Sequence, residues 1–236
     1  MSPDLLVLGL TWFVVFLFST TLHEAAHAFA AYRLGDPTAY HGGQVSLNPL
    51  PHIQREPLGM IVVPLITFVA QNGQWMMGWA SAPYDPTWAH RYPKRAAIMA
   101  LAGPFSNLLL ALLAGLLIWG GRAMGTLAPP DRISSITDIV AATDPSWSGA
   151  AVALSILFSL NVLLFVFNLL PLPPLDGSAV LPAFLSDAWA ERYREFLYQP
   201  MISLLGLVVA WQVFPKIYWP IYSLALRLLY PDVGYR

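Results

Sequence analysis

The chain has 236 residues, of which 57% are hydrophobic and 11% are charged. An ordinary soluble domain carries about 25% charged residues, so this composition indicates an integral membrane protein. The net charge of -1 offers no basic surface of the kind that binds nucleic acid, and the lack of cysteine excludes disulfides and thiolate metal ligands.

The first apolar segment, residues 5–22, contains no ionisable residue and leads directly into His23-Glu24-Ala25-Ala26-His27. About 20 apolar residues cross a bilayer, so we expect a spanning helix that begins near Pro3 and Asp4 and ends near Gly35. The preceding residues lack the basic stretch and the cleavage site of a secretory signal. We therefore expect this helix to be retained.

The His-Glu cluster places two imidazoles and a carboxylate in a segment that should lie in lipid. Ionisable groups are costly there without a compensating partner, which disfavours a chance occurrence. Residues four apart share one face of a helix, so His23 and His27 can bind one metal ion together. Glu24 reaches a water molecule at that ion and can act as a general base. A metal-dependent hydrolase needs this arrangement.

Residues 36–56 are rich in Gly, Pro and Asn, and we expect a loop there. The apolar stretch over residues 58–84 is interrupted by Pro64 and carries a turn-like Gln71-Asn72-Gly73-Gln74 near its middle. We expect a re-entrant hairpin that returns to its starting side of the membrane. The alternative is a full span, with a metal site nearer the middle of the bilayer.

The next uncharged run covers residues 96–121 and contains Gly103-Pro104-Phe105-Ser106-Asn107. Basic side chains between residues 91 and 95 precede this run and mark a membrane boundary. A polar connection over residues 126–145 follows it. We therefore expect a second complete span here.

A fourth uncharged run, residues 146–175, places Asn161 and Asn168 seven residues apart on one helix face. The prolines of Pro171-Leu172-Pro173-Pro174 cannot continue a helix. Asp176 is therefore expected on an extended turn that projects from the helix end and can point back at the bundle.

These segments predict an all-α polytopic membrane protein, a bundle of about four to six transmembrane helices with a re-entrant or β-hairpin segment after the first helix. A further apolar region, residues 201–229, is broken by two prolines and a lysine between residues 215 and 220. We expect a single membrane-embedded domain over residues 1–236, with the core of the metal site at about 5–185 and C-terminal membrane segments at about 197–230.

A catalytic zinc ion generally takes three protein ligands, so a third donor must join the two histidines. The candidates are Asp176, Asp36, His41, His52 and His90. Asp176 is the best placed chemically because it follows a long uncharged segment. An Asp-Gly pair is also a common turn signal, and that simpler interpretation stays open at this point.

Four segments together resemble the site-2 protease family of intramembrane zinc metalloproteases. They are His23-Glu24-Ala25-Ala26-His27, Ser46-Leu47-Asn48-Pro49-Leu50-Pro51-His52, Gly103-Pro104-Phe105-Ser106-Asn107 and Asn168-Leu169-Leu170-Pro171-Leu172-Pro173-Pro174-Leu175-Asp176-Gly177. Because neither a PDZ module nor a CBS domain is visible, the chain is similar to the compact prokaryotic type. The resemblance implies one Zn²⁺ per chain, bound by His23, His27 and Asp176, with Glu24 as the general base.

The resemblance also implies that Asn107 and Asn168 support the substrate or the developing oxyanion. An amide can donate a hydrogen bond to that charge without ionising itself. Asparagine also joins helices by hydrogen bonds in membrane bundles. For Asn107 and Asn161 both interpretations stay open.

The implied function is hydrolysis of peptide bonds in or near transmembrane helices of membrane-anchored substrates. The expected partners are a transmembrane protein substrate and the lipid bilayer of a prokaryotic cell, with no nucleic acid and with the oligomeric state left open. The alternatives are a membrane transporter for metal ions or protons and a catalytically silent scaffold that binds helices. Transport does not require a glutamate directly after the first histidine, which favours the protease.

Overall fold

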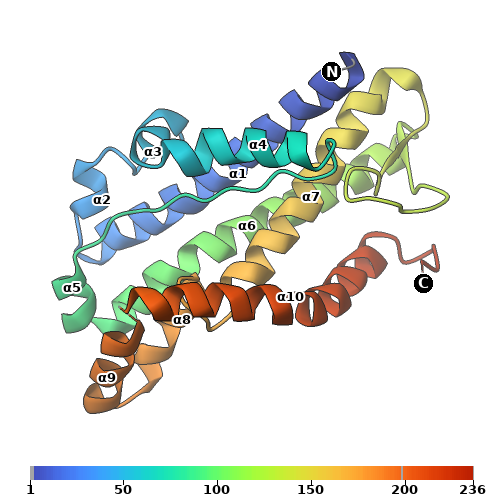
Figure 1. The fold of residues 1–236 in the computed structure, drawn as a ribbon. Helices are drawn as coiled ribbons and strands as arrows, with labels where there is room; N and C mark the ends of the chain where they lie inside the picture. Colours follow the sequence, from blue (N-terminus) through green and yellow to red (C-terminus); the bar gives the residue numbers. More distant parts are fainter. Residues whose placement is uncertain (1–2, 198, 236) are drawn as a thin grey trace.

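The computed structural model describes residues 3–197 and 199–235, and helices dominate it (Figure 1). The long helices are α1 (Pro3–Leu34), α6 (Pro93–Ala123), α7 (Ser148–Asn168) and α10 (Pro200–Leu229). The shorter ones are α2 (Thr38–His41), α3 (Pro49–Arg55), α4 (Val63–Ala70), α5 (Pro86–Arg91), α8 (Asp176–Val180) and α9 (Asp187–Leu197). A π-helical turn covers Leu58–Val62, and 3-10 turns cover Pro145–Trp147 and Leu181–Phe184. The short strands β1 (Leu127–Ala128) and β2 (Ala141–Ala142) pair antiparallel, with Leu127 opposite Ala142.

Several described helices are long and apolar enough to cross a membrane. They cover Asp4–Leu34, Pro93–Ala123, Pro145–Asn168 and Met201–Leu229. A fifth span results if the helix pair Pro49–Arg55 and Leu58–Ala70, which is bent by 112°, counts as one broken span. The predicted all-α polytopic fold with four to six spans is confirmed.

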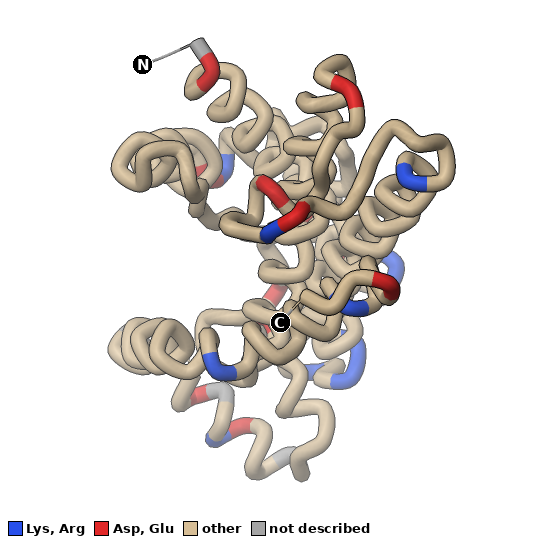
Figure 2. Tube along the Cα trace, turned by 90° about the vertical axis from the view of Figure 1, so that its right-hand side faces the viewer, with Lys and Arg blue, Asp and Glu red and all other residues tan. Residues whose placement is uncertain are grey.

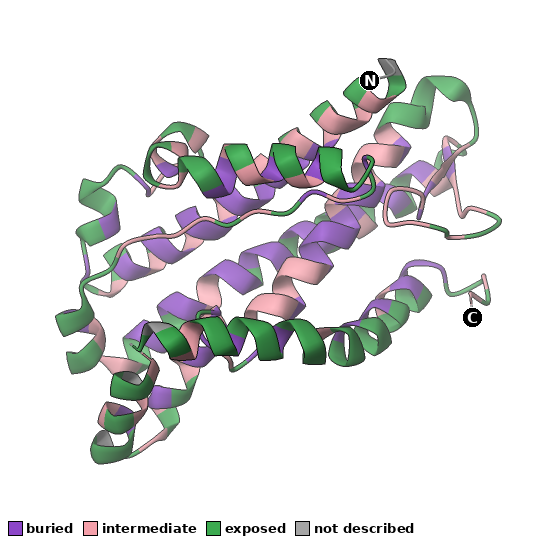
Figure 3. Cartoon of the chain, in the orientation of Figure 1, coloured by how far each residue is buried: buried purple, intermediate pink, exposed green. Residues whose placement is uncertain are grey.

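Helices α1, α6 and α7 pack against one another at the centre, and α10 packs against α7. Small buried residues such as Ala111 and Ala114 allow α6 to approach its neighbours closely. The outer faces of α4 and α10 are largely exposed (Figure 3), and they carry large apolar side chains such as Leu65 and Leu204. Charged residues lie mainly in loops and near helix ends (Figure 2). This distribution suits lipid around the helix bodies and water at their ends.

Residues 58–84 form a hairpin with one helical and one extended arm. The chain runs out through the π-helical turn and α4, reverses at Asn72 and Gly73 in the left-handed backbone region, and returns without regular structure. The arms touch where the amide of Trp79 donates to the carbonyl of Gly59 over 3.1 Å. The amide of Met77 likewise donates to Oγ1 of Thr67 over 3.1 Å. The hairpin is therefore not a β-hairpin, because its outgoing arm satisfies its own backbone groups as a helix.

The return arm of the hairpin ends beside Asp36, which follows the end of α1. Oδ2 of the buried Asp36 accepts a hydrogen bond from the amide of Asp85 over 2.8 Å. Oδ1 of Asp36 accepts hydrogen bonds from the amide and the hydroxyl of Thr38. One carboxylate thus joins the start and the end of the segment, near α2 and α5 (Figure 1). The re-entrant course of the hairpin in the membrane stays a prediction.

Three local expectations need correction. The predicted loop over residues 36–56 contains α2 and α3, and α3 forms because the side chain of Asn48 caps it and Pro49 suits its first position. Helix α10 runs unbroken through Pro215 and Pro220, since a membrane helix tolerates the loss of single backbone hydrogen bonds. The extended turn ends at Leu175, so Asp176 is the first residue of α8.

Candidate metal centre

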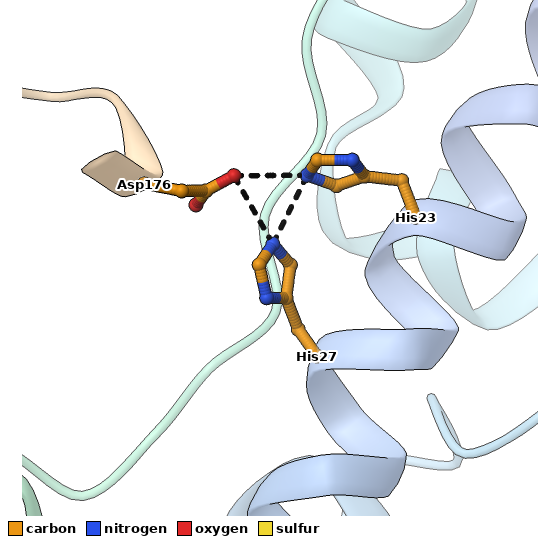
Figure 4. Close-up of side chains that lie close together, drawn as sticks. All are labelled: His23, His27 and Asp176. Carbon is orange, nitrogen blue, oxygen red and sulfur yellow. Dashed lines mark hydrogen bonds and ion pairs between the residues drawn. The ribbon is translucent and has the colours of Figure 1, made fainter. Parts of the chain in front are cut away.

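Two elements far apart in sequence bring together a group that could hold a metal ion. His23 and His27 lie one turn apart on α1, and Asp176 lies at the start of α8. Figure 4 shows the two rings and the carboxylate converging from these separate elements. Nε2 of His23 and Nε2 of His27 are 3.0 Å apart. Oδ2 of Asp176 lies 3.2 Å from the first nitrogen and 3.3 Å from the second.

The outer nitrogen of each ring has a hydrogen-bond acceptor. Nδ1 of His27 donates to the carbonyl of Met99 over 2.7 Å, and Nδ1 of His23 donates to Oδ1 of Asn107 over 2.6 Å. With the proton on Nδ1, each neutral ring directs the Nε2 lone pair at the other ring and at Asp176. Oδ2 of Asp176 is buried and has no hydrogen-bond donor in the described structure. Three acceptor atoms thus face one another, and this arrangement calls for a cation between them.

The spacing and the surroundings of these atoms fit zinc. With ligand bonds of about 2.0–2.1 Å, two ligands of a tetrahedral zinc ion lie roughly 3.3 Å apart. Helix α6 passes directly beside the site, and a β-carbon on Gly103 would lie 2.2 Å from Nε2 of His27 and 2.6 Å from Nε2 of His23. The missing side chain of Gly103 leaves that space open. Nitrogen and oxygen donors from two His and one Asp also match known catalytic zinc sites with two His and one carboxylate.

Glu24 opens onto the same cavity as two residues of this group. Its side chain is buried, with 6% exposed, and it lines a cavity of about 370 Å³ together with His27 and Asp176. Residues 80–84 of the return arm and Pro173, Pro174 and Leu175 form further walls of this cavity. A carboxylate and a metal-binding group therefore open onto one common space, as a hydrolytic site requires.

The two predicted supporting asparagines differ in their surroundings. Asn107 is fully buried, and its Oδ1 is engaged with the ring of His23. Asn168 is the last residue of α7 and is half-buried, and it is not among the described residues that line the cavity. The oxyanion role of both residues stays a prediction.

The other candidates for a third ligand are engaged elsewhere. Asp36 closes the hairpin, His41 stacks edgewise on Tyr40, and His90 faces Glu191 at 3.1 Å. Nε2 of the buried His52 donates to the carbonyl of Ser46 over 3.0 Å. Asp176 is thus the candidate that the structure places with both histidines.

Sequence reasoning missed two features of the site. The carbonyl of Met99 is a backbone group without a residue-type signal, so no motif could have indicated it. Gly103 is the first residue of the Gly103-Pro104-Phe105-Ser106-Asn107 motif. A glycine in a helix interior indicates that another group approaches closely, but the fold was needed to identify that group as the rings of His23 and His27.

Comparisons with known proteins give one consistent result. The family model described as Peptidase family M50 matches residues 11–211. "Putative zinc metalloprotease YwhC" of Bacillus subtilis (strain 168) is 34% identical over 206 residues, which are 84% of this chain and 83% of that protein. "Putative zinc metalloprotease Rip2" of Mycobacterium tuberculosis (strain ATCC 25618 / H37Rv) is 31% identical over 208 residues, 86% of this chain and 70% of that protein. No solved structure matches the chain.

Proposed function

We propose that this chain, which belongs to Peptidase family M50 and is a membrane-bound zinc metalloprotease, cleaves peptide bonds within or near the membrane-spanning helices of other membrane proteins. In this proposal His23, His27 and Asp176 bind the zinc ion, and Glu24 is the general base. Asn107 and Asn168 are proposed to support the substrate or the oxyanion.

One observation carries the proposal. His23, Glu24 and His27 lie inside the apolar span Asp4–Leu34, and the cavity that Glu24 and His27 line also receives Asp176. Buried ionisable groups at membrane depth mark a functional site, since they are costly without a partner. A protease whose reactive groups lie within its spans is suited to peptide bonds that are themselves in the membrane.

In the proposed hydrolysis, metal binding and proton transfer are carried out by different residues. A zinc ion held by His23, His27 and Asp176 would polarise the peptide carbonyl and make water a stronger acid. Glu24 accepts a proton from the attacking water and then donates it to the nitrogen of the leaving amine. The bond between the carbonyl carbon and that nitrogen breaks, and the products are a carboxylate and an amine. The carbonyl of Met99 holds the His27 ring in place throughout.

The substrate has to present an accessible carbonyl to these groups. An intact transmembrane helix keeps its carbonyls in internal hydrogen bonds, so the substrate must unwind locally before cleavage. Gly, Pro or Asn in the substrate span favour unwinding, because they weaken or interrupt a helix. Substrates with such residues should be cleaved faster than uniformly leucine-rich spans.

The test uses the purified chain in liposomes with zinc and a single-span reporter protein. Wild type should cut the reporter inside or beside its span, whereas Glu24→Gln should lose nearly all activity because the amide cannot accept the proton. Glu195→Gln changes an exposed glutamate on α9 and serves as the matched control. Full proteolysis by Glu24→Gln would contradict the role of Glu24. Cleavage of soluble peptides but never of the reporter span would contradict action in the membrane.

A further inference from the structure

Three buried polar side chains form a chain of hydrogen bonds behind the metal centre. Ser19 on α1, Asn107 on α6 and Asn161 on α7 are each 0% exposed. Burial of a polar group costs free energy unless the group is hydrogen-bonded. Each of these three side chains is hydrogen-bonded. The network connects the three central helices and ends at His23.

The direction of this network is fixed at its far end by a backbone group. Nδ2 of Asn161 donates to the carbonyl of Leu157 over 2.8 Å and to Oγ of Ser19 over 2.9 Å. A carbonyl oxygen only accepts, so the amino end of the Asn161 amide must face Leu157. Its oxygen therefore faces Asn107.

The same logic determines the orientation of the next amide. Oδ1 of Asn161 accepts a hydrogen bond from Nδ2 of Asn107 over 2.8 Å. Oδ1 of Asn107 is then left to face Nδ1 of His23, at 2.6 Å. An amide oxygen accepts, so Nδ1 of His23 must carry the ring proton.

The orientation of Asn107 decides whether His23 can bind a metal ion. If the amide were reversed, its amino group would face Nδ1, and the proton of the neutral ring would move to Nε2. Nε2 would then have no lone pair for a metal ion. His27 has no such dependence, because the backbone carbonyl of Met99 fixes its ring directly.

We propose that Asn161 is a positioning residue for the metal centre: supported by Ser19, it sets the orientation of the Asn107 amide and thereby the metal-binding tautomer of His23. This inference rests on the ligand role of His23, which is part of the proposed function. Groups that orient a metal-binding histidine commonly change metal affinity 10- to 100-fold when removed.

The test exploits the difference between an amide and a carboxyl group. Asn161→Leu is made in the natural chain and in an Asn107→Asp background, and the zinc dissociation constant of each purified protein is measured by competition with a chelator. In the natural chain the substitution should weaken zinc binding about 10-fold or more. In the Asn107→Asp background it should change binding less than about 3-fold, because either oxygen of a carboxyl group can accept from His23.

Ser159→Ala is the matched control. It also removes a buried hydrogen bond on α7, the 2.7 Å contact with the hydroxyl of Tyr222, and should leave zinc affinity unchanged. If Asn161→Leu does not fold, as judged by circular dichroism of the metal-free protein, Asn161→Ala replaces it in the same four-way comparison. The absorption spectrum of the cobalt-substituted proteins gives a second readout of the ligand environment.

The outcomes separate this inference from the proposed function. Equal weakening in both backgrounds, or no weakening in either, would show that Asn161 only joins helices and would overturn the inference. A natural chain that binds no zinc would instead overturn the ligand assignment itself. Weakening confined to the natural chain supports the positioning role.

Discussion

Gly103 and His27 approach each other so closely that no side chain fits between α6 and the His27 ring. A β-carbon at residue 103 would lie 2.2 Å from Nε2 of His27, which is less than any real contact of this kind allows. Helix α6 accepts hydrogen bonds from both histidine rings, at Met99 and Asn107. The same helix therefore also lies against the Nε2 atoms of the two rings. The proposed metal site therefore requires a glycine here, although this residue contributes no ligand.

Gly103→Ala should consequently displace the ion or push α6 away from α1. We expect zinc affinity to fall about 10-fold or more, with loss of proteolysis, as for other changes next to metal ligands. Gly120→Ala on the same helix is the control, because a β-carbon there meets nothing within 4 Å. Chelator competition and reporter cleavage measure both variants. Unchanged zinc binding by Gly103→Ala would show that the site is not where the structure places it.

Metal removal should destabilise the protein, because three acceptor atoms then face one another without a cation. Zinc that binds the folded state should raise the midpoint of thermal unfolding. In Asp176→Asn this rise should become smaller, since a neutral amide is a poorer ligand for zinc. Asp232→Asn, which removes the exposed partner of Arg122, should keep the full response. An identical zinc-dependent shift in Asp176→Asn and wild type would exclude Asp176 as a ligand.

Gly206 on α10 lies directly against the segment that carries Asp176. A β-carbon on Gly206 would be 2.1 Å from the carbonyl oxygen of Pro173, three residues before the aspartate. Gly206→Ala should therefore move this segment and weaken zinc binding severalfold, whereas Leu205→Ala at the exposed neighbouring position should not. Zinc titration of the two variants provides the measurement, and equal affinities would show that α10 does not support the site.

The contact between Asp36 and Asp85 predicts on which side the hairpin ends lie. Because the chain has no cysteine, single cysteines can be introduced without background. Gly42→Cys and Thr87→Cys should react with an impermeant reagent from the same side of sealed vesicles. Asp131→Cys, beyond the α6 span, should react from the opposite side. Labelling of residues 42 and 87 from opposite sides would establish a full span in place of a re-entrant hairpin.

The sequence was sufficient for the spans α1, α6 and α7 and for the pair of histidines that could bind a metal ion. A run of about 20 residues without charged side chains identifies a membrane helix. The ends of α1 and α6 lie close to the predicted ends. The four-residue spacing of His23 and His27 places both on one helix face under any packing. These are local properties of the chain, so they do not depend on what surrounds it.

Other features depended on the environment of a segment. The uninterrupted course of α10 through Pro215 and Pro220 was not predictable from propensity alone, since lipid removes the competing hydrogen bonds of water. Similarly, α3 forms from a sequence that resembles a loop, because a capping side chain and a proline at its start stabilise one short helix. Short elements of this kind are decided by single contacts.

What the sequence determined by itself is therefore an apolar, helical membrane chain with a pair of histidines that could bind a metal ion and a glutamate beside them. Only the tertiary structure decided that Asp176 meets that pair, that Gly103 leaves space beside the two rings, and that the amide of Asn107 faces His23. Each of these contacts joins residues more than 70 positions apart, and their distances are set by how α1, α6 and α8 pack. Periodicity along one segment contains no information about that packing.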